Sequence, residues 1–168
     1  MRFLQRLESL YRAERCRLFT YALSLLGDES LAEDVVQDVF RRFCETPVNP
    51  KDLRSFVYRS VRNRAIDLLR RKSRRKTYTH PSAPASIYAI DTTLAEQSIL
   101  SQERAHQVET ALQTLRIEER EIIVLHIYNG LTFDAIAKIL DAPIGTMVSR
   151  YHRSLTKLQK KLKGEKAQ

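Results

Sequence analysis

Residues 131–155 read LTFDAIAKILDAPIGTMVSRYHRSL, and the fold of the C-terminal half depends on them. Thr132 is a cap-forming residue ahead of a short helical pattern, in which the small Ala137 allows another helix to approach closely. Asp141-Ala142-Pro143 then turns the chain, and a second helical pattern begins directly after it. Two helices joined by so tight a turn predict a helix-turn-helix.

The second helix of this motif has two chemically different faces. One face repeats apolar side chains at steps of three and four residues: Met147, Tyr151, Leu155, Leu158 and Leu162. The other carries, beside Val148, the polar and cationic residues Ser149, His152, Arg153, Thr156, Lys157 and Lys160. Such groups suit base edges and phosphates in a DNA major groove. An amphipathic helix pair with a solvated cationic face would show the same pattern, so both interpretations remain open from this motif alone.

Helical periodicity also covers most of the chain outside this motif. Apolar residues recur at helical spacing over residues 4–26, 30–45, 53–69, 94–115 and 118–128, and the chain holds only 4 Gly and 5 Pro. Gly27-Asp28 ends the first helix, Ser30 and Glu33 predict a capping box for the second, and Asn49-Pro50 predicts the start of the third. The sequence therefore predicts an all-α protein.

Residues 77–92 read TYTHPSAPASIYAIDT and lose the helical period. Two prolines among small and polar residues are typical of a flexible linker. We therefore expect two small helical domains, residues 1–76 and residues 94–168, joined by a flexible linker at residues 77–93.

Positive charge is concentrated in two blocks of the chain. The net charge is +9, and residues 51–80 alone carry +9 while residues 141–168 carry +5. The other stretches are slightly acidic. Two separated basic blocks favour two contacts on one polyanion. An RNA-binding or ribosome-binding protein would explain this charge as well.

The first basic block is a predicted helix that ends in RRKSRRK at residues 70–76. Phe56 and Tyr58 lie near its start, and cations interleaved with aromatic rings suit single-stranded or distorted nucleic acid. Aromatic residues at helical spacing also fill protein cores. Base contact by Phe56 and Tyr58 is therefore one of two interpretations.

The preceding helix presents an acidic patch, Asp34, Gln37 and Asp38, opposite its apolar face. Such a patch would repel phosphate, so it is not expected on a DNA-facing surface. It is either a solubilising face or a docking surface for a basic protein partner.

Several classes of protein do not fit the sequence. Charges every few residues over residues 1–15 are unlike a signal peptide, and no apolar run reaches membrane-spanning length, so we expect a cytoplasmic protein without membrane insertion. Cys16 and Cys44 lie in helical patterns and are expected to be core thiols. No nucleophile–base pair, phosphate-binding glycine loop or Cys/His cluster is present, which indicates a protein that is not an enzyme and uses no metal or cofactor.

Three stretches, in this order, resemble one protein family. They are AEDVVQDVF at residues 32–40, RSFVYRSVRNRAIDLLRR at residues 54–71 and EEREIIVLHIYNGLTFDAIAKILDAPIGTMVSR at residues 118–150. With them the chain resembles a bacterial RNA polymerase sigma factor of the extracytoplasmic-function (ECF) group of the sigma-70 family, over residues 5–76 and 100–161. The resemblance implies a region 2 helical bundle, a region 4 helix-turn-helix, and a subunit that binds core RNA polymerase and directs it to specific promoters.

The resemblance also implies roles for single residues. Docking on the clamp helices of the polymerase β′ subunit would fall to Asp34, Gln37 and Asp38. The promoter −10 element would be contacted at its bases by Asn63 and Asp67 and nearer its phosphates by Arg64, Arg70, Arg71 and Arg74. The −35 element would be contacted by Thr146, Ser149, Arg150, His152, Arg153 and Lys157. The loop at residues 46–52 would hold a flipped −10 base, and the resemblance allows an anti-sigma factor as a further partner.

The sequence departs from the family pattern at three places. Val148 stands where the family commonly has Lys or Arg, His126 replaces a common Arg, and TPVNPKDL at residues 46–53 lacks the usual glycine and aromatic pattern. The base preference of this loop therefore does not follow from the resemblance. The alternative function is a helix-turn-helix regulator that acts without joining polymerase. It would explain residues 130–163, but neither the acidic patch nor the first basic helix.

Overall fold

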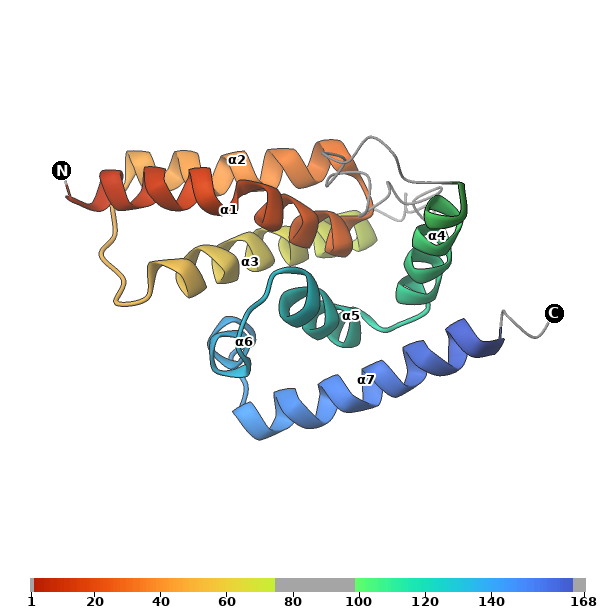
Figure 1. Ribbon diagram of the computed structural model, residues 1–168. Coiled ribbons are helices and arrows are strands. Elements are labelled where there is room, and N and C mark those ends of the chain that lie inside the picture. The colour runs from red at the N-terminus through yellow and green to blue at the C-terminus, as the bar shows by residue number, and fades with distance from the viewer. Residues whose placement is uncertain (1, 75–98, 165–168) are drawn as a thin grey trace. The chain divides into compact units, whose positions relative to one another are not determined.

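The computed structural model describes the backbone of residues 2–74 and 99–164, with side chains described from residue 106 onward in the second range. The helices are α1 (Arg2–Leu26), α2 (Glu29–Glu45), α3 (Leu53–Arg74), α4 (Ile99–Gln113), α5 (Ile117–Ile123), η2 (Val124–Tyr128), α6 (Phe133–Leu140) and α7 (Ile144–Gly164). No strand occurs within these two ranges, which confirms the predicted all-α fold class (Figure 1).

The chain forms two compact units. The first contains α1, α2 and α3, and the second contains α4, α5, η2, α7 and most of α6. The linker expected at residues 77–93 lies outside the described residues, so the domain bounds 1–76 and 94–168 stay predictions. In the described parts of the chain, no helix combines the length and the apolar character needed to cross a membrane.

In the first unit, α1, α2 and α3 pack against one another around one apolar core. Every fourth residue of α3 contributes to it, and Val57, Val61 and Ala65 are fully buried. Tyr21 of α1 contacts Tyr58 of α3, with ring centroids 5.9 Å apart. Because this stripe of α3 is buried, the polar residues on its other side are turned toward the surface.

A buried carboxylate joins α1 to α3 beside this core. Glu14 is only 7% exposed, and its Oε2 accepts a hydrogen bond from the Tyr58 hydroxyl at 2.9 Å. Its Oε1 lies 2.8 Å from Arg54 Nη2 and 3.5 Å from Arg17 Nη1. A carboxylate loses its hydration when it is buried, so these three partners are what makes its burial tolerable.

The start of α2 differs from the sequence prediction. Gly27 ends α1 with a φ of 65°, as predicted, and Asp28 then caps α2 by accepting from the Leu31 N–H at 2.9 Å. The predicted capping box at Ser30 is wrong, because α2 begins at Glu29 and Ser30 already lies within its first turn. Asp28 reaches the orphan amide first, since it follows the turn in an extended conformation.

α3, by contrast, begins later than predicted. Asp52 accepts hydrogen bonds from the Ser55 N–H at 3.0 Å and from the Ser55 hydroxyl at 2.8 Å, and α3 begins at Leu53. The predicted cap at Asn49 is therefore wrong. Because the Asp52 carboxylate accepts both hydrogen bonds from the residue three positions later, it fixes where the helix starts. Residues 46–52 therefore remain a loop.

Both cysteines are exposed, so the prediction of two core thiols is wrong. Cys16 lies two residues before the buried Leu18, which turns it roughly 200° away from that side of α1. Cys44 lies in the last turn of α2, whereas the buried residues of this helix end at Phe40.

The second unit is built around the apolar face of α7. Met147 and Leu158 are buried, and Tyr151, Leu155 and Leu162 are partly buried, as the sequence predicts. The cluster that includes Leu158 also holds Ala111, Leu112, Leu115 and Ile123, from α4, the turn after it and α5. The packing of α7 against α4 and α5 leaves its opposite face exposed.

The predicted helix over residues 118–128 changes its pitch part-way. α5 continues without a break into η2, where the Asn129 N–H donates to the Val124 carbonyl at 3.0 Å, five residues back. Gly130, with a φ of 64°, ends this segment. Thr132 then caps α6 through the Ala135 N–H at 3.3 Å, and Asp141, with a φ of 54°, lies in the turn before α7. The predicted cap at Thr132 and the predicted turn at Asp141 are thus confirmed.

Candidate nucleic-acid interface

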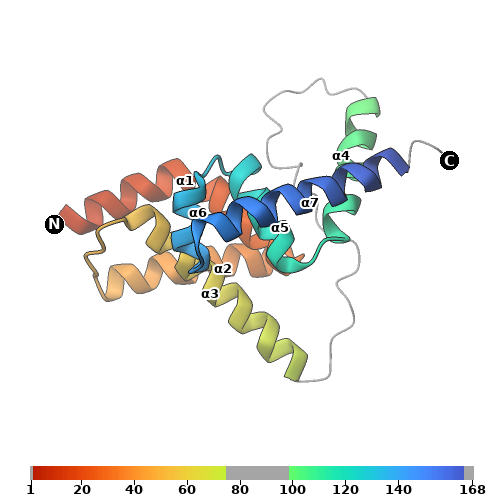
Figure 2. The same cartoon turned by 90° about the horizontal axis from the view of Figure 1, so that it is seen from below.

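One side of α3 gathers five of the six residues predicted to contact the −10 element. Asn63, Asp67, Arg70, Arg71 and Arg74 are all exposed, and steps of three and four residues keep them on one side of the helix. The buried residues of α3 end at Ala65, and Figure 2 shows the later turns of α3 extending beyond α1 and α2. This stripe is therefore accessible to an extended ligand.

Arg64, the sixth predicted residue, is engaged by α2. Its side chain is 26% exposed, and its Nε lies 2.9 Å from Asp38 Oδ2. The Nε–H is not aligned with that oxygen, so the contact is an ion pair without a hydrogen bond. Arg64 is thus held inside the unit rather than presented to a phosphate.

Asp38 is the centre of a cluster of cations. Its side chain is only 12% exposed, and it lies 2.5 Å from Arg41 Nη2 and 3.1 Å from Arg42 Nε as well as beside Arg64. Burial alone would raise the pKa of this carboxyl, but the Arg41 hydrogen bond and the charges of Arg42 and Arg64 outweigh it and lower the pKa. Asp38 therefore joins α2 to α3, a role that the sequence pattern does not reveal.

Asp34 and Gln37, the other residues predicted to dock on polymerase, are exposed. Gln37 Nε2 donates to Glu33 Oε1 at 3.1 Å, and Asp34 has no ion-pair partner within the described residues. Both line a hollow of about 460 Å³ between α2 and α3, together with Asp38 and Arg64. The structure thus brings part of the acidic patch and part of the basic helix to one place.

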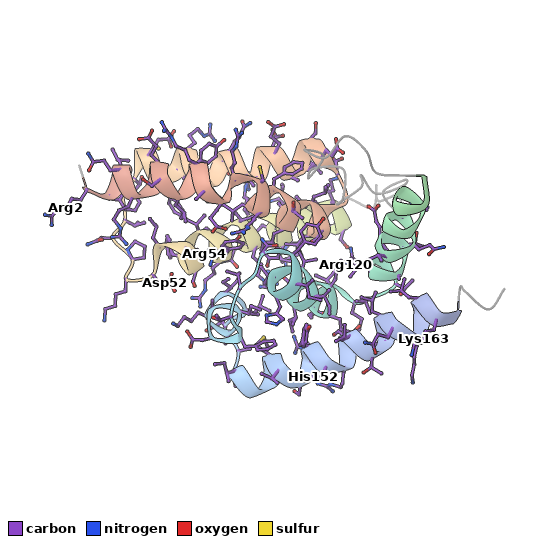
Figure 3. All side chains as sticks on the ribbon, in the orientation of Figure 1. Arg2, Asp52, Arg54, Arg120, His152 and Lys163 are labelled. Carbon is purple, nitrogen blue, oxygen red and sulfur yellow. The ribbon has the colours of Figure 1, made fainter. Side chains whose placement is uncertain are left out.

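The outward face of α7 carries the residues predicted to contact the −35 element. Ser149, His152 and Arg153 are exposed, while Thr146 and Arg150 are partly buried. Figure 3 labels His152 on α7. Arg153 Nε donates to the Ser149 carbonyl at 3.3 Å, and the Ser149 hydroxyl donates to the Thr146 carbonyl at 3.2 Å. These local bonds order the polar face before any ligand arrives.

Lys157, the sixth residue of this set, pairs with Glu119 of α5. The hydrogen bond from Lys157 lowers the pKa of Glu119, whereas partial burial would raise that pKa. The Arg116 N–H donates to Glu119 Oε2 at 3.2 Å and lowers the pKa further. Lys157, Glu119 and Arg116 line one hollow with Arg150 and Arg153. Sequence reasoning missed Arg116 and Glu119; their only signal was the charged start of α5.

The aromatic residues of α3 belong to the core. Tyr58 is 1% exposed and donates a hydrogen bond to Glu14, so of its two interpretations, base contact and core, the structure supports the core. Phe56 is partly buried, and its ring lies 5.3 Å from that of Phe43 in α2. The core interpretation holds for both.

Two models of one protein family match the chain: Sigma-70 region 2 over residues 10–75 and Sigma-70 region 4 over residues 105–158. Together they cover more than half of its length. This chain belongs to the sigma-70 family. The matched ranges include the exposed stripe of α3 to Arg74 and the polar face of α7 to Lys157, so both candidate interfaces of this sigma factor lie in family regions.

Curated relatives are ECF RNA polymerase sigma factors, which confirms the group that the sequence resembles. SigE of Mycolicibacterium smegmatis is 28% identical over 154 residues, covering 90% of this chain and 60% of the relative. SigW of Bacillus subtilis is 27% identical over 157 residues, covering 88% of this chain and 83% of the relative. The chain spans about half of a third relative, a probable ECF factor SigI of Mycobacterium tuberculosis, of which 52% is covered.

Two solved structures share the fold. RpoE, in complex with the anti-sigma factor NepR from Bartonella quintana, matches with a TM-score of 0.72 at 24% identity and covers 96% of both chains. CnrH, in complex with the cytosolic domain of CnrY, matches with a TM-score of 0.69 at 21% identity and covers 96% of this chain and 90% of that chain.

Replacing Glu119 by glutamine is expected to strengthen duplex binding by this sigma factor, because the change releases Lys157 for phosphate contact. One more contact should steepen the log–log salt dependence of binding by about 0.9. Fluorescence anisotropy of the full chain with a labelled duplex measures this slope. Glu118→Gln is the matched control, since it removes the same charge from an exposed neighbour that does not pair with Lys157. Equal slopes for the two variants would contradict the expectation.

The same pair has a defined pH dependence. Because the folded pKa of Glu119 is lowered, the ion pair is fully present above the usual glutamate value of about 4.3 and is lost as pH falls through the lowered value. The wild-type protein and the Glu119→Gln variant should therefore bind duplex alike once pH falls below that window. If the two proteins still differ in duplex binding below that pH window, the effect of Glu119→Gln does not come from the Glu119–Lys157 ion pair.

Proposed function

We propose that this chain is a promoter-specificity subunit that binds core RNA polymerase and directs it to promoters with defined −10 and −35 elements. It performs no bond-making chemistry of its own. The observation that carries the proposal is that each unit buries one face of a long helix and exposes a polar, cationic face on the other. Two such faces in one sigma-70 chain suit two promoter contacts.

In the first unit, we assign recognition of −10 bases to Asn63 and Asp67. An amide and a carboxylate are the side chains that bond to adenine and cytosine edges respectively. Arg70, Arg71 and Arg74 follow on the same stripe and are assigned to phosphates, which fix position without reading sequence. Arg64 is assigned a supporting role, because Asp38 already holds it.

In the second unit, Ser149, His152 and Arg153 are assigned to the −35 element, with Thr146 and Arg150 at the edge of the contact. Their exposure on one side of α7 supports insertion of that side into a major groove. Lys157 enters the contact only where its bond to Glu119 is given up.

Docking on the β′ clamp helices is assigned to Asp34 and Gln37. The exposure of both residues and the unpaired carboxylate of Asp34 within the described residues support it. The similar sigma factor RpoE has been solved in complex with the anti-sigma factor NepR, and we propose a partner of this kind for this chain too.

Run-off transcription tests the function. Templates are chosen by mapping the transcript starts that appear when the chain is overproduced, and each is transcribed with core polymerase alone, with the chain alone and with both. Specific products are expected only with both. Transcription that does not need the chain would refute the proposal. Tight and specific binding of duplex promoter DNA without polymerase would favour an independent regulator.

Substitutions along α3 should distinguish residues that recognise −10 bases from residues that bind phosphates. Replacing Arg70 and Arg71 by alanine is expected to weaken holoenzyme binding to all promoters alike and to reduce the salt slope by about 0.7–0.9 for each arginine–phosphate pair removed. Asn63→Ala should instead change which promoter is preferred, by about 1–3 kcal/mol for the base concerned. Competition between two mapped promoters measures the preference. If both changes only weaken binding, the division of roles along α3 is wrong.

A further inference from the structure

The first unit carries a basic groove that neither candidate DNA face uses. It has a volume of about 830 Å³ and lies where the first turns of α1 meet the start of α3. Arg2 and Arg6 line it from α1, Lys51 and Arg54 from the other side, and Asp52 and Leu53 complete it. Figure 1 shows the starts of α1 and α3 toward the same end of this unit, and Figure 3 labels Arg2, Asp52 and Arg54 there.

The positive charge of this groove has little compensation inside the protein. Arg2, Arg6 and Lys51 are exposed, and none has an ion-pair partner within the described residues. Among the residues that the structure describes, Asp52 is the one acidic side chain lining the groove. Partial burial would raise its pKa, but the two hydrogen bonds from Ser55 outweigh this and lower the pKa, so the carboxylate stays charged as the cap of α3.

The fourth cation, Arg54, is a fixed part of the wall. Its Nη2 is held 2.8 Å from Glu14, and its guanidinium carbon lies 6.0 Å from the centre of the Tyr58 ring. α1 adds to the charge, because its first turn holds no acidic residue and places Arg2 at the positive end of the helix dipole. The other three cations, Arg2, Arg6 and Lys51, have no ion-pair partner within the described residues, and such a gathering favours an anionic ligand.

The form of the site favours a single strand over a duplex. Proteins read a duplex by inserting a convex element into its groove, whereas a basic groove in the protein surface follows the backbone of a single strand. Lys51 and Asp52 also end the loop at residues 46–52, so the groove continues directly from that loop.

We propose that this groove binds the backbone phosphates of single-stranded promoter DNA next to the 46–52 loop, with Arg2, Arg6 and Lys51 as the contacting cations. The inference rests on the proposed function, because a strand is exposed beside the loop only when polymerase opens the promoter there. It adds a contact on α1, outside the stripe on α3.

The test uses holoenzyme and a mapped promoter fragment whose −10 region is held open by mismatches. The double variant Arg6→Gln, Lys51→Gln is expected to bind this fragment more weakly, with a salt slope smaller by about 1.4 for two single-strand contacts. The ratio of the wild-type binding constant to that of the double variant should therefore fall about sevenfold between about 50 and about 200 mM salt. Binding of a duplex fragment that carries only the −35 element should not change.

Arg15→Gln is the matched control for Arg6→Gln. Arg15 is exposed on the same helix, and nine residues of α-helix place it roughly 180° around from Arg6. The single variant Arg6→Gln should lose about 0.7 of the slope, and Arg15→Gln none. Thermal unfolding followed by circular dichroism should give the same midpoint for both, since neither residue is buried.

Two results would overturn the proposal. One is equal binding and equal slope for the wild type and the double variant. The other is an equal loss for Arg6→Gln and Arg15→Gln, which would reduce the effect to net charge. If polyglutamate binds the wild type and not the double variant, while both bind the open fragment alike, the groove takes an acidic polypeptide instead. Failure of the proposed function is distinguishable, because wild-type holoenzyme would then give no specific transcript.

Discussion

Replacing Asp34 by arginine is expected to reduce specific run-off transcription by about a hundredfold, because a like charge placed against a basic docking partner costs several kcal/mol. Asp34 is exposed and has no ion pair within the described residues, so the substitution should change the free energy of unfolding by no more than about 0.5 kcal/mol. Run-off assays and urea unfolding of the free chain measure the two effects separately.

Asp38→Arg is the informative comparison. It should also abolish transcription, but it removes the carboxylate from between Arg41, Arg42 and Arg64 and adds a fourth cation. Breaking a buried pair costs about 3–5 kcal/mol, and the exposure of Arg41 and Arg42 brings the expected loss of stability to about 2–3 kcal/mol. Normal transcription by the Asp34→Arg variant would remove Asp34 from the docking surface.

Replacing Glu14 by alanine is expected to destabilise the first unit by about 3 kcal/mol or more. The change leaves the buried Tyr58 hydroxyl without its acceptor and Arg54 without its carboxylate, and uncompensated buried polar groups are among the costliest defects in a fold. A loss of this size is a large part of the total stability of a small domain. Urea unfolding followed by circular dichroism measures it.

Two further variants show how much of the Glu14→Ala effect comes from the charge and how much from the burial of the network. Glu14→Gln keeps an oxygen for the Tyr58 hydroxyl and loses only the charge, so its effect should be smaller. Glu8→Ala, on the same helix, breaks an exposed pair with Arg12 and should cost less than about 1 kcal/mol. If Glu8→Ala and Glu14→Ala destabilise the protein equally, the buried network contributes nothing beyond a surface pair.

Periodicity alone was sufficient to predict the helices and the faces of α7. Its apolar stripe from Met147 to Leu162 is buried or partly buried, and Ser149, His152 and Arg153 are exposed, because a period of three to four residues fixes which residues share a side. Asn63, Asp67 and Arg70 were named from the family resemblance, and the same helical geometry explains why they lie on one side of α3. Such predictions need only the geometry of one helix.

The pairs between helices were beyond the reach of the pattern. Two ion pairs, Asp38 with Arg64 and Glu119 with Lys157, form only at one shift and one rotation of a helix relative to its neighbour. The periodicity of a single helix determines neither the shift nor the rotation. The helix starts failed for a related reason. Asp28 and Ser30 are both good caps, as are Asn49 and Asp52, and the choice depends on which side chain reaches an orphan amide in the folded turn.

The π-helical segment η2 gives the chain a place between α5 and α6 at which its length can change. Its ladder bonds five residues back, so one turn holds nearly one residue more than an α-helical turn does. Five residues of such a segment therefore turn the chain about as far as four α-helical residues do. Deleting one residue here, such as the exposed Ile127, would restore the ordinary ladder and leave α5 facing nearly the same way relative to the turn at Asn129 and Gly130. Glu119 would stay beside Lys157, and Ile123 would stay in the core. This segment is therefore expected to tolerate the loss of one position over evolution, whereas the same loss inside an ordinary α-helix would rotate the residues before it by roughly 100°.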